Sequence, residues 1–205
     1  MEWQPMPRFN VRDYRRSELI EAAIASIAER GLPDTTLATI AHQAGVSPGL
    51  VNHYFDGKEE LLEATLRRLM KELATQIRRL TPPDPKPMQR LEAVIDGCLD
   101  IEQLRPGAWL AWRAFWTYIP VNPRLTALQR TINARFRSNI RYALRELVPA
   151  SDVHEVYLGL FALIDGFWIR QFIEPDSFTM ADARNVCRRF LRLALEDGSR
   201  PNSRL

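Results

Sequence analysis

The sequence predicts an all-α protein, and three observations support this prediction. Apolar residues recur at three- and four-residue steps along most of the chain, as they do on one face of a helix. Proline and glycine interrupt that pattern at the points where helices would end. No segment shows the alternation of apolar and polar residues, bounded by turns, that is typical of a strand. With 205 residues, 46% of them hydrophobic, the chain is long enough to bury a full core.

Capping residues and glycines divide the first part of the chain. Between residues 17 and 28 the apolar side chains recur at helical spacing, and Gly31 provides a helix stop. We therefore expect the first helix to begin at Ser17. A second, shorter helix follows Thr36, which is a good N-cap, and ends at Gly45.

The third expected helix is short and the fourth is long. Ser47 is an N-cap, and Pro48 occupies the first helical position, where its missing N–H costs nothing. This helix ends near Phe55, before an Asp-Gly pair. From residue 58 to residue 80 apolar residues return at heptad-like spacing, which predicts a helix of about six turns.

A proline-rich segment separates the two parts of the chain. Residues 81–87 read TPPDPKP, with four prolines in seven positions, and cannot continue a helix. We expect the domain boundary here. Prolines and glycines then delimit five further helices, at residues 88–104, 108–118, 123–147, 151–173 and 179–195.

Composition argues against export and against a membrane protein. The longest apolar stretch, residues 158–169, is shorter than the roughly 20 residues of a membrane span and is interrupted by Asp165. The first residues lack the basic-then-apolar order of a secretory signal. Cys98 and Cys187 suit buried thiols in a reducing compartment better than a disulfide framework. We therefore expect a cytoplasmic protein with no membrane partner.

The residue pattern does not favour catalysis. The three histidines, His42, His53 and His154, are dispersed and have no acid or cysteine nearby at metal-ligand spacing. We expect His42 and His154 to be solvated surface residues. The sequence therefore predicts a protein that is not an enzyme, with no cofactor and no bound metal ion.

The second and third helices, joined by a turn around AGVS, match the helix-turn-helix arrangement, in which the second helix of the pair enters the major groove of DNA. That helix has few large apolar residues, and Pro48 and Gly49 would let its backbone approach DNA closely. Lys58 begins the next helix, where its charge and the free N–H groups favour a phosphate. The side chains that offer donors and acceptors to base edges or phosphates are Ser47, Asn52, His53 and Tyr54.

The charge of this region argues against a nonspecific polycation. Residues 1–60 hold six Arg or Lys and nine Asp or Glu, although the whole chain has a net charge of +3. The positive charge is local, because Arg8, Arg12, Arg15 and Arg16 precede the first expected helix. Capped short helices also occur in helical proteins without DNA activity, so a partner-binding helical protein is an alternative on pattern alone.

Four elements occur together near the N-terminus: AAIASIAERG, TTLATIAHQAGVS, HYF and KEEL. In length, order and punctuation, residues 15–66 resemble the N-terminal domain of the TetR family of transcriptional regulators. The resemblance implies that Thr36 and Thr39 contact phosphates at the start of the second helix. It also implies that Pro48, Gly49 and His53 face bases. Contacts mainly to the DNA backbone would come from Ser47, Asn52, Tyr54 and Lys58.

The same resemblance implies a domain organisation. Residues 1–57 would hold an N-terminal arm and a three-helix, helix-turn-helix DNA-binding domain, and residues 58–80 a connecting helix. Residues 81–197 would form a helical ligand-binding and dimerisation domain, followed by a tail at residues 198–205. The last two helices would clasp a homodimer that binds a palindromic operator in double-stranded DNA. The candidate dimer contacts are Leu158, Phe161, Phe172, Phe190 and Leu191.

Aromatic residues gather in the expected ligand-binding region. Trp109, Trp112 and Trp116 fall three and four positions apart, on one face of a helix that also holds Phe115. Trp168 adds a fourth indole from the segment LIDGFWIR. Indole faces are the best side-chain partners for a quaternary ammonium such as choline, so these residues form a candidate aromatic cage.

A carboxylate would add long-range attraction for a cation, and the candidates are Asp165, Glu102 and Asp100. The alternative interpretation is that the aromatic stripe is core. In that case Asp165 would pair with Arg170 or Arg113, or bond across the dimer, which is a common fate for an ionised residue in an apolar helix.

The segments AWLAWRAFW and LIDGFWIR, together with the N-terminal motifs, resemble the BetI branch of the TetR family. That resemblance implies a repressor of betaine synthesis genes that responds to choline. The same segments also resemble a wider set of regulators with this type of C-terminal domain, whose ligands need not be choline. A different small-molecule effector therefore stays open.

Overall fold

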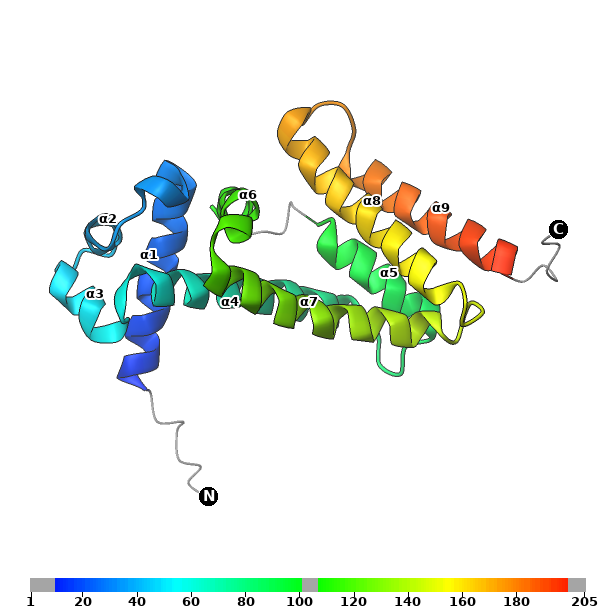
Figure 1. Ribbon diagram of the computed structural model, residues 1–205, viewed down its shortest axis with the longest axis horizontal. Coiled ribbons are helices and arrows are strands. Elements are labelled where there is room, and N and C mark those ends of the chain that lie inside the picture. The colour runs from blue at the N-terminus through cyan, green and yellow to red at the C-terminus, as the bar shows by residue number, and fades with distance from the viewer. Residues whose placement is uncertain (1–9, 101–106, 199–205) are drawn as a thin grey trace, which may run out of the picture. The chain divides into compact units, whose positions relative to one another are not determined.

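The computed structural model describes residues 10–100 and 107–198, and within these ranges its regular structure is helical throughout (Figure 1). The helices are α1 (Val11–Asp34), α2 (Leu37–Gln43), α3 (Pro48–Tyr54), α4 (Gly57–Leu80), α5 (Pro87–Cys98), α6 (Ala108–Tyr118), the 3-10 turn η2 (Ile119–Val121), α7 (Pro123–Leu144), α8 (Val153–Ile173) and α9 (Met180–Gly198). The predicted all-α fold is confirmed.

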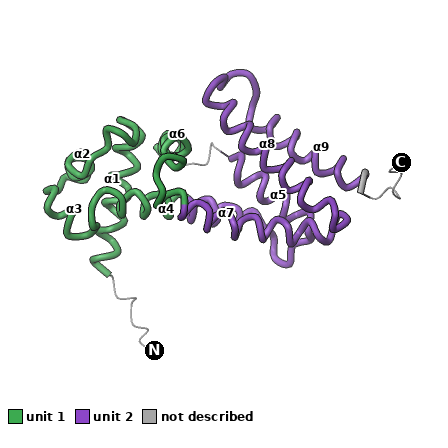
Figure 2. Tube along the Cα trace, in the orientation of Figure 1, with its two compact units in different colours: residues 1–69, 105–126 green, residues 70–104, 127–205 purple. Residues whose placement is uncertain are grey.

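The chain divides into two compact units, coloured separately in Figure 2. The first unit comprises residues 1–69 and 105–126, and the second comprises residues 70–104 and 127–205. The unit border falls inside α4 and inside α7, so each of these helices contributes residues to both units.

The helix α1 starts earlier than the sequence pattern predicts. It begins at Val11, because the side chain of Asn10 caps it by accepting the N–H of Arg12 at 3.1 Å. Arg12, Arg15 and Arg16 therefore lie within α1 and do not precede it. The predicted stop at Gly31 is a kink, where φ of 78° takes the backbone out of helical geometry before a last turn that ends at Asp34.

The core of the first unit joins the first four helices. Its buried members are Leu19, Ala22, Ala23, Ile40, Ala41, Val51, Phe55 and Leu61. The helix α6 packs on α1 in the same unit, where a Cβ at Gly107 would lie 3.3 Å from Cβ of Ala28. Glycine at this position therefore permits the close approach of the two helices.

The core of the second unit is formed by α5, α7, α8 and α9. Two side chains from α8 and α9 cap the end of α5, because Nε1 of Trp168 donates to the carbonyl of Cys98 at 2.8 Å and Nη1 of Arg184 donates to the carbonyl of Leu99 at 2.9 Å. This end lies well before the predicted residue 104, since Leu99 leaves helical geometry.

The two cysteines are free and buried in this core, as the sequence predicts. Burial raises the pKa of the Cys98 thiol to about 12 and that of the Cys187 thiol to about 11. Both side chains therefore stay protonated near neutral pH.

Among the described residues, α8 is the one helix that is long and apolar enough, by length and composition alone, to cross a bilayer. A single helix of this kind is weak evidence for a membrane span, because core helices of other proteins pass the same test. Only 28% of its most apolar window is buried within the chain, so much of α8 is left uncovered.

Candidate nucleic-acid interface

The turn between α2 and α3 is built by local hydrogen bonds and one glycine. Gly45 has φ of 66°, which an L side chain rarely adopts, and the N–H of Val46 donates to the carbonyl of Ala41 at 3.0 Å. The Ser47 hydroxyl then caps α3 by accepting the N–H of Leu50 at 3.3 Å. These contacts fix the direction in which α3 leaves the turn.

The helix α3 has one buried and one exposed side. Val51 is fully buried, and Phe55, which follows the helix, is 1% exposed. The exposed residues of α3 and its cap are Ser47, Pro48, Gly49, Asn52 and His53. Tyr54 is half-buried, and its ring contacts the ring of His53 edge-on, with centroids 5.1 Å apart. The structure thus brings the predicted base-facing residues together on one solvent-facing surface.

The first turn of α2 is held by a reciprocal capping box. The Thr36 hydroxyl accepts the N–H of Thr39 at 3.1 Å, and the Thr39 hydroxyl accepts the N–H of Thr36 at 2.9 Å. Ser26 of α1 lies 3.2 Å from the same Thr39 hydroxyl. Thr36 is exposed and Thr39 is half-buried, so of the two predicted phosphate contacts Thr36 is the more accessible.

Lys58 has a partner inside the protein. Its ammonium donates to the carbonyl of Leu32 at 3.0 Å, which ties the start of α4 to the last turn of α1. In this conformation the charge is used at least in part to satisfy a backbone carbonyl after the kink at Gly31. A phosphate contact by Lys58 would have to share this side chain.

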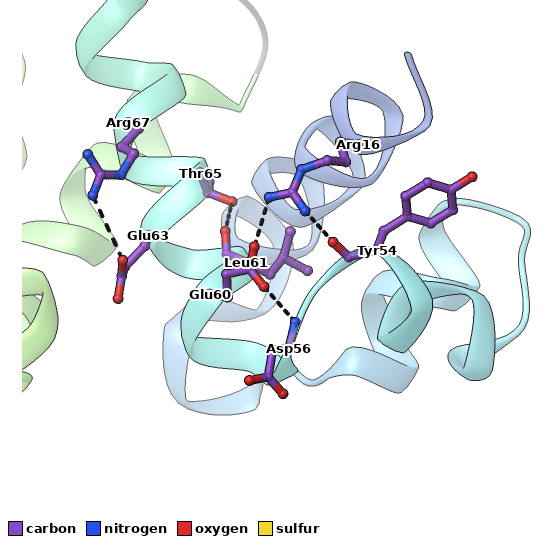
Figure 3. Close-up of polar contacts among 8 residues, drawn as sticks. All are labelled: Arg16, Tyr54, Asp56, Glu60, Leu61, Glu63, Thr65 and Arg67. Atoms are coloured by element: carbon purple, nitrogen blue, oxygen red, sulfur yellow. Dashed lines mark hydrogen bonds and ion pairs between the residues drawn. The ribbon is translucent and has the colours of Figure 1, made fainter. Parts of the chain in front are cut away.

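A cluster of side chains around Arg16, which the sequence pattern does not predict, fixes the end of α3 (Figure 3). The guanidinium of Arg16 donates through Nη1 to the carbonyl of Tyr54 and lies 4.1 Å from the ring centroid of Phe55. Its Nη2 donates to Oε1 of Glu60 at 2.8 Å, and Oε2 of Glu60 accepts the N–H of Asp56 at 2.6 Å. Helices α1, α3 and α4 are therefore tied together where α3 ends.

The same contacts change the acidity of Glu60. The N–H of Asp56 and the guanidinium of Arg16 stabilise the ionised carboxylate, and together they hold the pKa of Glu60 below its ordinary value of 4.5. Tyr54 and Glu60, the hydrogen-bond partners of Arg16, lie 38 and 44 residues from it along the chain. A single sequence gives no periodic signal for such contacts.

The basic residues near the N-terminus have different roles. Arg16 donates to Tyr54 and Glu60 in the cluster described above. Arg15 forms an ion pair with Glu18, with 2.7 Å between Nη1 and Oε2. Arg12 is exposed on the first turn of α1. Arg8 lies outside the described residues.

The residues of the candidate aromatic cage fall in two units. Trp112 and Phe115 of α6 are 7% and 0% exposed, which makes both part of the core, while Trp109 and Trp116 are half-buried. All four belong to the first unit, whereas Asp165 and Trp168 belong to the second. The core interpretation therefore holds for Trp112 and Phe115.

The surroundings of Asp165 differ from the predicted ion pair. Arg170, one expected partner, pairs instead with Glu174 at 3.1 Å. Asp165 is on the exposed part of α8, yet desolvation by nearby side chains raises the pKa of its carboxyl. Of the other candidate carboxylates, Asp100 accepts a hydrogen bond from Gln76 at 3.1 Å, and Glu102 lies outside the described residues.

Apolar side chains are exposed along α8 and α9. Leu158, Ile169 and Ile173 of α8 are 51%, 45% and 64% exposed, and Val186 and Leu193 of α9 are 45% and 53% exposed. One predicted dimer contact is wrong, because Leu191 is 1% exposed and belongs to the core of its own chain.

Comparison with known families matches both parts of the chain. Residues 19–65 match the family described as bacterial regulatory proteins, tetR family. Residues 87–196 match the family described as BetI-type transcriptional repressor, C-terminal. The two matches together cover the candidate interface and most of the second unit.

Relatives match over 80% or more of the chain. The HTH-type transcriptional regulator BetI of Pseudomonas paraeruginosa is 37% identical over 94% of this chain and 100% of its own. The protein of the same name from Burkholderia mallei is 40% identical over 80% of this chain and 85% of its own. The crystal structure of a transcriptional regulator from Saccharomonospora viridis, in complex with choline, is 25% identical with a TM-score of 0.75, and covers 88% of this chain and 96% of its own.

Proposed function

Because the chain belongs to the TetR family of bacterial regulatory proteins and has a BetI-type C-terminal domain, it is a DNA-binding transcriptional regulator and not an enzyme, and we propose that it acts as a homodimeric, effector-controlled repressor. The observation that carries the proposal is the exposed surface of α3, where Gly49, Asn52 and His53 face solvent on a helix anchored by Val51 and Phe55. We expect it to act in the cytoplasm, on operator DNA.

Each subunit would insert α3 into the major groove of a palindromic operator. Half-sites one helical turn apart would place the two helices about 34–36 Å apart. Asn52 and His53 would contact bases or phosphates from the exposed side of α3, while the caps at Thr36 and Ser47 would bring backbone N–H groups to phosphates. The two subunits would meet through the exposed apolar residues of α8 and α9.

The effector in this proposal is choline or a related quaternary ammonium, and the controlled genes are those of betaine synthesis. Two findings support it: the relatives are named BetI, and the regulator from Saccharomonospora viridis has choline bound. In the second unit, half-buried Trp168 and the nearby Asp165 on α8 would contribute an aromatic face and a negative charge. The effector would act by binding more tightly to the conformation that no longer fits the operator.

The test is a titration of the purified protein against DNA upstream of its own gene, followed by fluorescence anisotropy at fixed salt with and without choline. Asn52→Ala and His53→Ala should each weaken specific binding roughly tenfold or more, since a good base contact contributes about 1–3 kcal/mol. The matched control is His42→Ala. His42 is also an exposed histidine, but it lies on α2, so this variant should bind the operator with normal affinity.

The outcomes separate the parts of the proposal. Specific binding that weakens with choline supports both the repressor and its effector. Specific binding indifferent to choline keeps the repressor and assigns the effector to another small molecule. A chain that dimerises but binds no sequence specifically would favour the alternative of a helical partner-binding protein.

A further inference from the structure

A cavity of about 300 Å³ lies in the second unit, lined by residues from the end of α4, from α5 and from the last half of α7. This volume is at the lower end of the range for small-molecule sites, roughly 300–1,000 Å³. Its apolar wall includes Leu91, Val94 and Ile140, which are 1%, 8% and 1% exposed. The candidate aromatic residues do not belong to this wall.

Two arginines line the same cavity from different helices. Arg78 comes from the last turn of α4, and Arg90 from the first turn of α5. A guanidinium has five N–H donors. Arg78 donates through Nη2 to the Thr75 hydroxyl at 2.9 Å, and Arg90 donates through Nε to the carbonyl of Pro85 at 3.2 Å.

Within the described residues neither arginine has a carboxylate at ion-pair distance, and the described lining holds no Asp or Glu. Both guanidinium groups therefore keep N–H donors and a charge that no described carboxylate pairs with. Since Arg pairs with carboxylates through two parallel hydrogen bonds, an anion is the ligand that these groups recognise best.

The third wall adds polar groups and further positive charge. The guanidinium of Arg90 lies 5.8 Å from the ring centroid of Tyr142, which keeps it over the α7 side of the cavity. Asn139, one turn earlier, also lines the cavity and offers an amide. The part of α7 that belongs to the second unit, residues 127–144, has four arginines and no acidic residue, so its field favours an anion.

We propose that this cavity binds a small organic anion with an apolar tail, of the medium-chain carboxylate class. Arg78 and Arg90 bind the carboxylate, and the tail lies against Leu91, Val94 and Ile140. The site is separate from the DNA-reading surface and from the aromatic residues proposed for the effector. Its ligand has the opposite charge to a quaternary ammonium.

The experiment is calorimetric titration of the full-length protein with octanoate, with 1-octanol as the uncharged ligand of equal tail length. Octanoate should bind with one site per chain, at least tenfold more tightly than octanol, because the two arginines act on the carboxylate alone. Saturating choline should leave octanoate affinity unchanged. Displacement by choline, or equal affinity for octanol, would overturn the proposal.

Variants identify the residues. Arg78→Leu and Arg90→Leu should each weaken octanoate binding roughly tenfold. Both positions are exposed, so the thermal unfolding midpoint should stay the same. Arg79→Leu is the matched control, since Arg79 is exposed on the same turn of α4 but does not line the cavity. No octanoate binding, or equal weakening by Arg79→Leu, would refute the assignment. None of these measurements depends on operator binding.

Discussion

Two basic side chains next to α3, Arg16 and Lys58, have partners inside the protein. Arg16 binds the carbonyl of Tyr54 and the carboxylate of Glu60, and Lys58 binds the carbonyl of Leu32. The positive charges of Arg16 and Lys58 therefore help to hold α3 and the start of α4 in place. The exposed residues that remain for DNA on α3 are small or uncharged polar ones, which suits recognition by close backbone approach and hydrogen bonding.

Substitution of Gly49 by alanine should change the stability of the fold and the affinity for DNA in opposite directions. A Cβ at this position would meet only the Ser47 hydroxyl, at 3.9 Å, so Gly49→Ala has room in the free protein. Since alanine favours a helix over glycine by roughly 0.5–1 kcal/mol, urea unfolding should show higher stability. Operator affinity, measured by anisotropy, should fall, because in the proposed complex the new methyl would lie where the backbone approaches DNA. Unchanged affinity would place Gly49 away from the DNA.

Glu60 gives the clamp at the end of α3 a predictable pH dependence. Its pKa is lowered in the folded protein, so its stabilising contribution is present above the ordinary value of 4.5 and is lost as pH falls through the folded value. Glu60→Gln should therefore be less stable than wild type at pH 7. The gap between their urea midpoints should narrow as pH falls below 4.5. A gap that is constant with pH would mean that ionisation of Glu60 does not support the fold.

The sequence predicts that α3 offers polar side chains, but not what holds α3 in place. Asn52 and His53 are predicted from their residue types on a short capped helix, because the positions of Val46, Leu50 and Val51 do not divide its faces cleanly by pattern alone. Arg16 and Glu60 come from α1 and α4, Phe55 directly follows α3, and the spacing of the three residues has no helical period. The contacts of Arg16 depend on how α1, α3 and α4 cross one another, and the local pattern of residues in one sequence does not show these crossings.

At the scale of the helix, caps that are near in sequence predict the starts of α2 and α3, whereas α1 starts six residues before the predicted Ser17. Thr36, Ser47 and Pro48 mark the starts of α2 and α3 because side-chain caps and proline act within one turn. The end of α5 was missed because apolar residues continue past Cys98 at helical spacing. There the capping groups come from Trp168 and Arg184, far along the chain.

The crossing of α4 and α5 depends on one glycine. A Cβ at Gly97 would lie 2.4 Å from Cγ1 and 3.2 Å from Cα of Ile77. Because Cα belongs to the backbone, a change of the Ile77 rotamer cannot relieve the second contact. Gly97→Ala should therefore separate the two helices and destabilise the protein by about 1–3 kcal/mol, as overpacking does. The measurement is the urea midpoint, with Gly49→Ala as the alanine control. If Gly97→Ala is as stable as wild type, the helices are not in such close contact.

At the scale of the whole molecule, the proposed homodimer would cover the exposed apolar residues of α8 and α9. Leu158→Arg should give monomers in sedimentation velocity and weaken operator binding, since one subunit reads only one half-site. Val121→Arg is the control, because Val121 is 73% exposed but lies outside these two helices. A dimer that survives Leu158→Arg would place the subunit interface elsewhere.

The exposed apolar residues also show the limit of sequence patterns at this scale. Apolar residues of α8 that are buried, such as Leu160 and Ile164, alternate with exposed ones such as Leu158 and Ile169. Hydrophobicity alone does not tell the core of one chain from a surface left for a second chain. For this reason the sequence pattern places Leu191, which is 1% exposed, among the dimer contacts.

The two deeply buried thiols make the native protein suitable for spectroscopic labelling. With pKa values near 12 and 11, Cys98 and Cys187 present almost no thiolate to a maleimide at neutral pH. A single introduced thiol, as in His42→Cys, can therefore take a dye or spin label without first removing the natural cysteines. In a dimer labelled this way, the distance between the two probes would report the separation of the two DNA-binding domains in solution. The measurement could be made with and without an effector, and in real time.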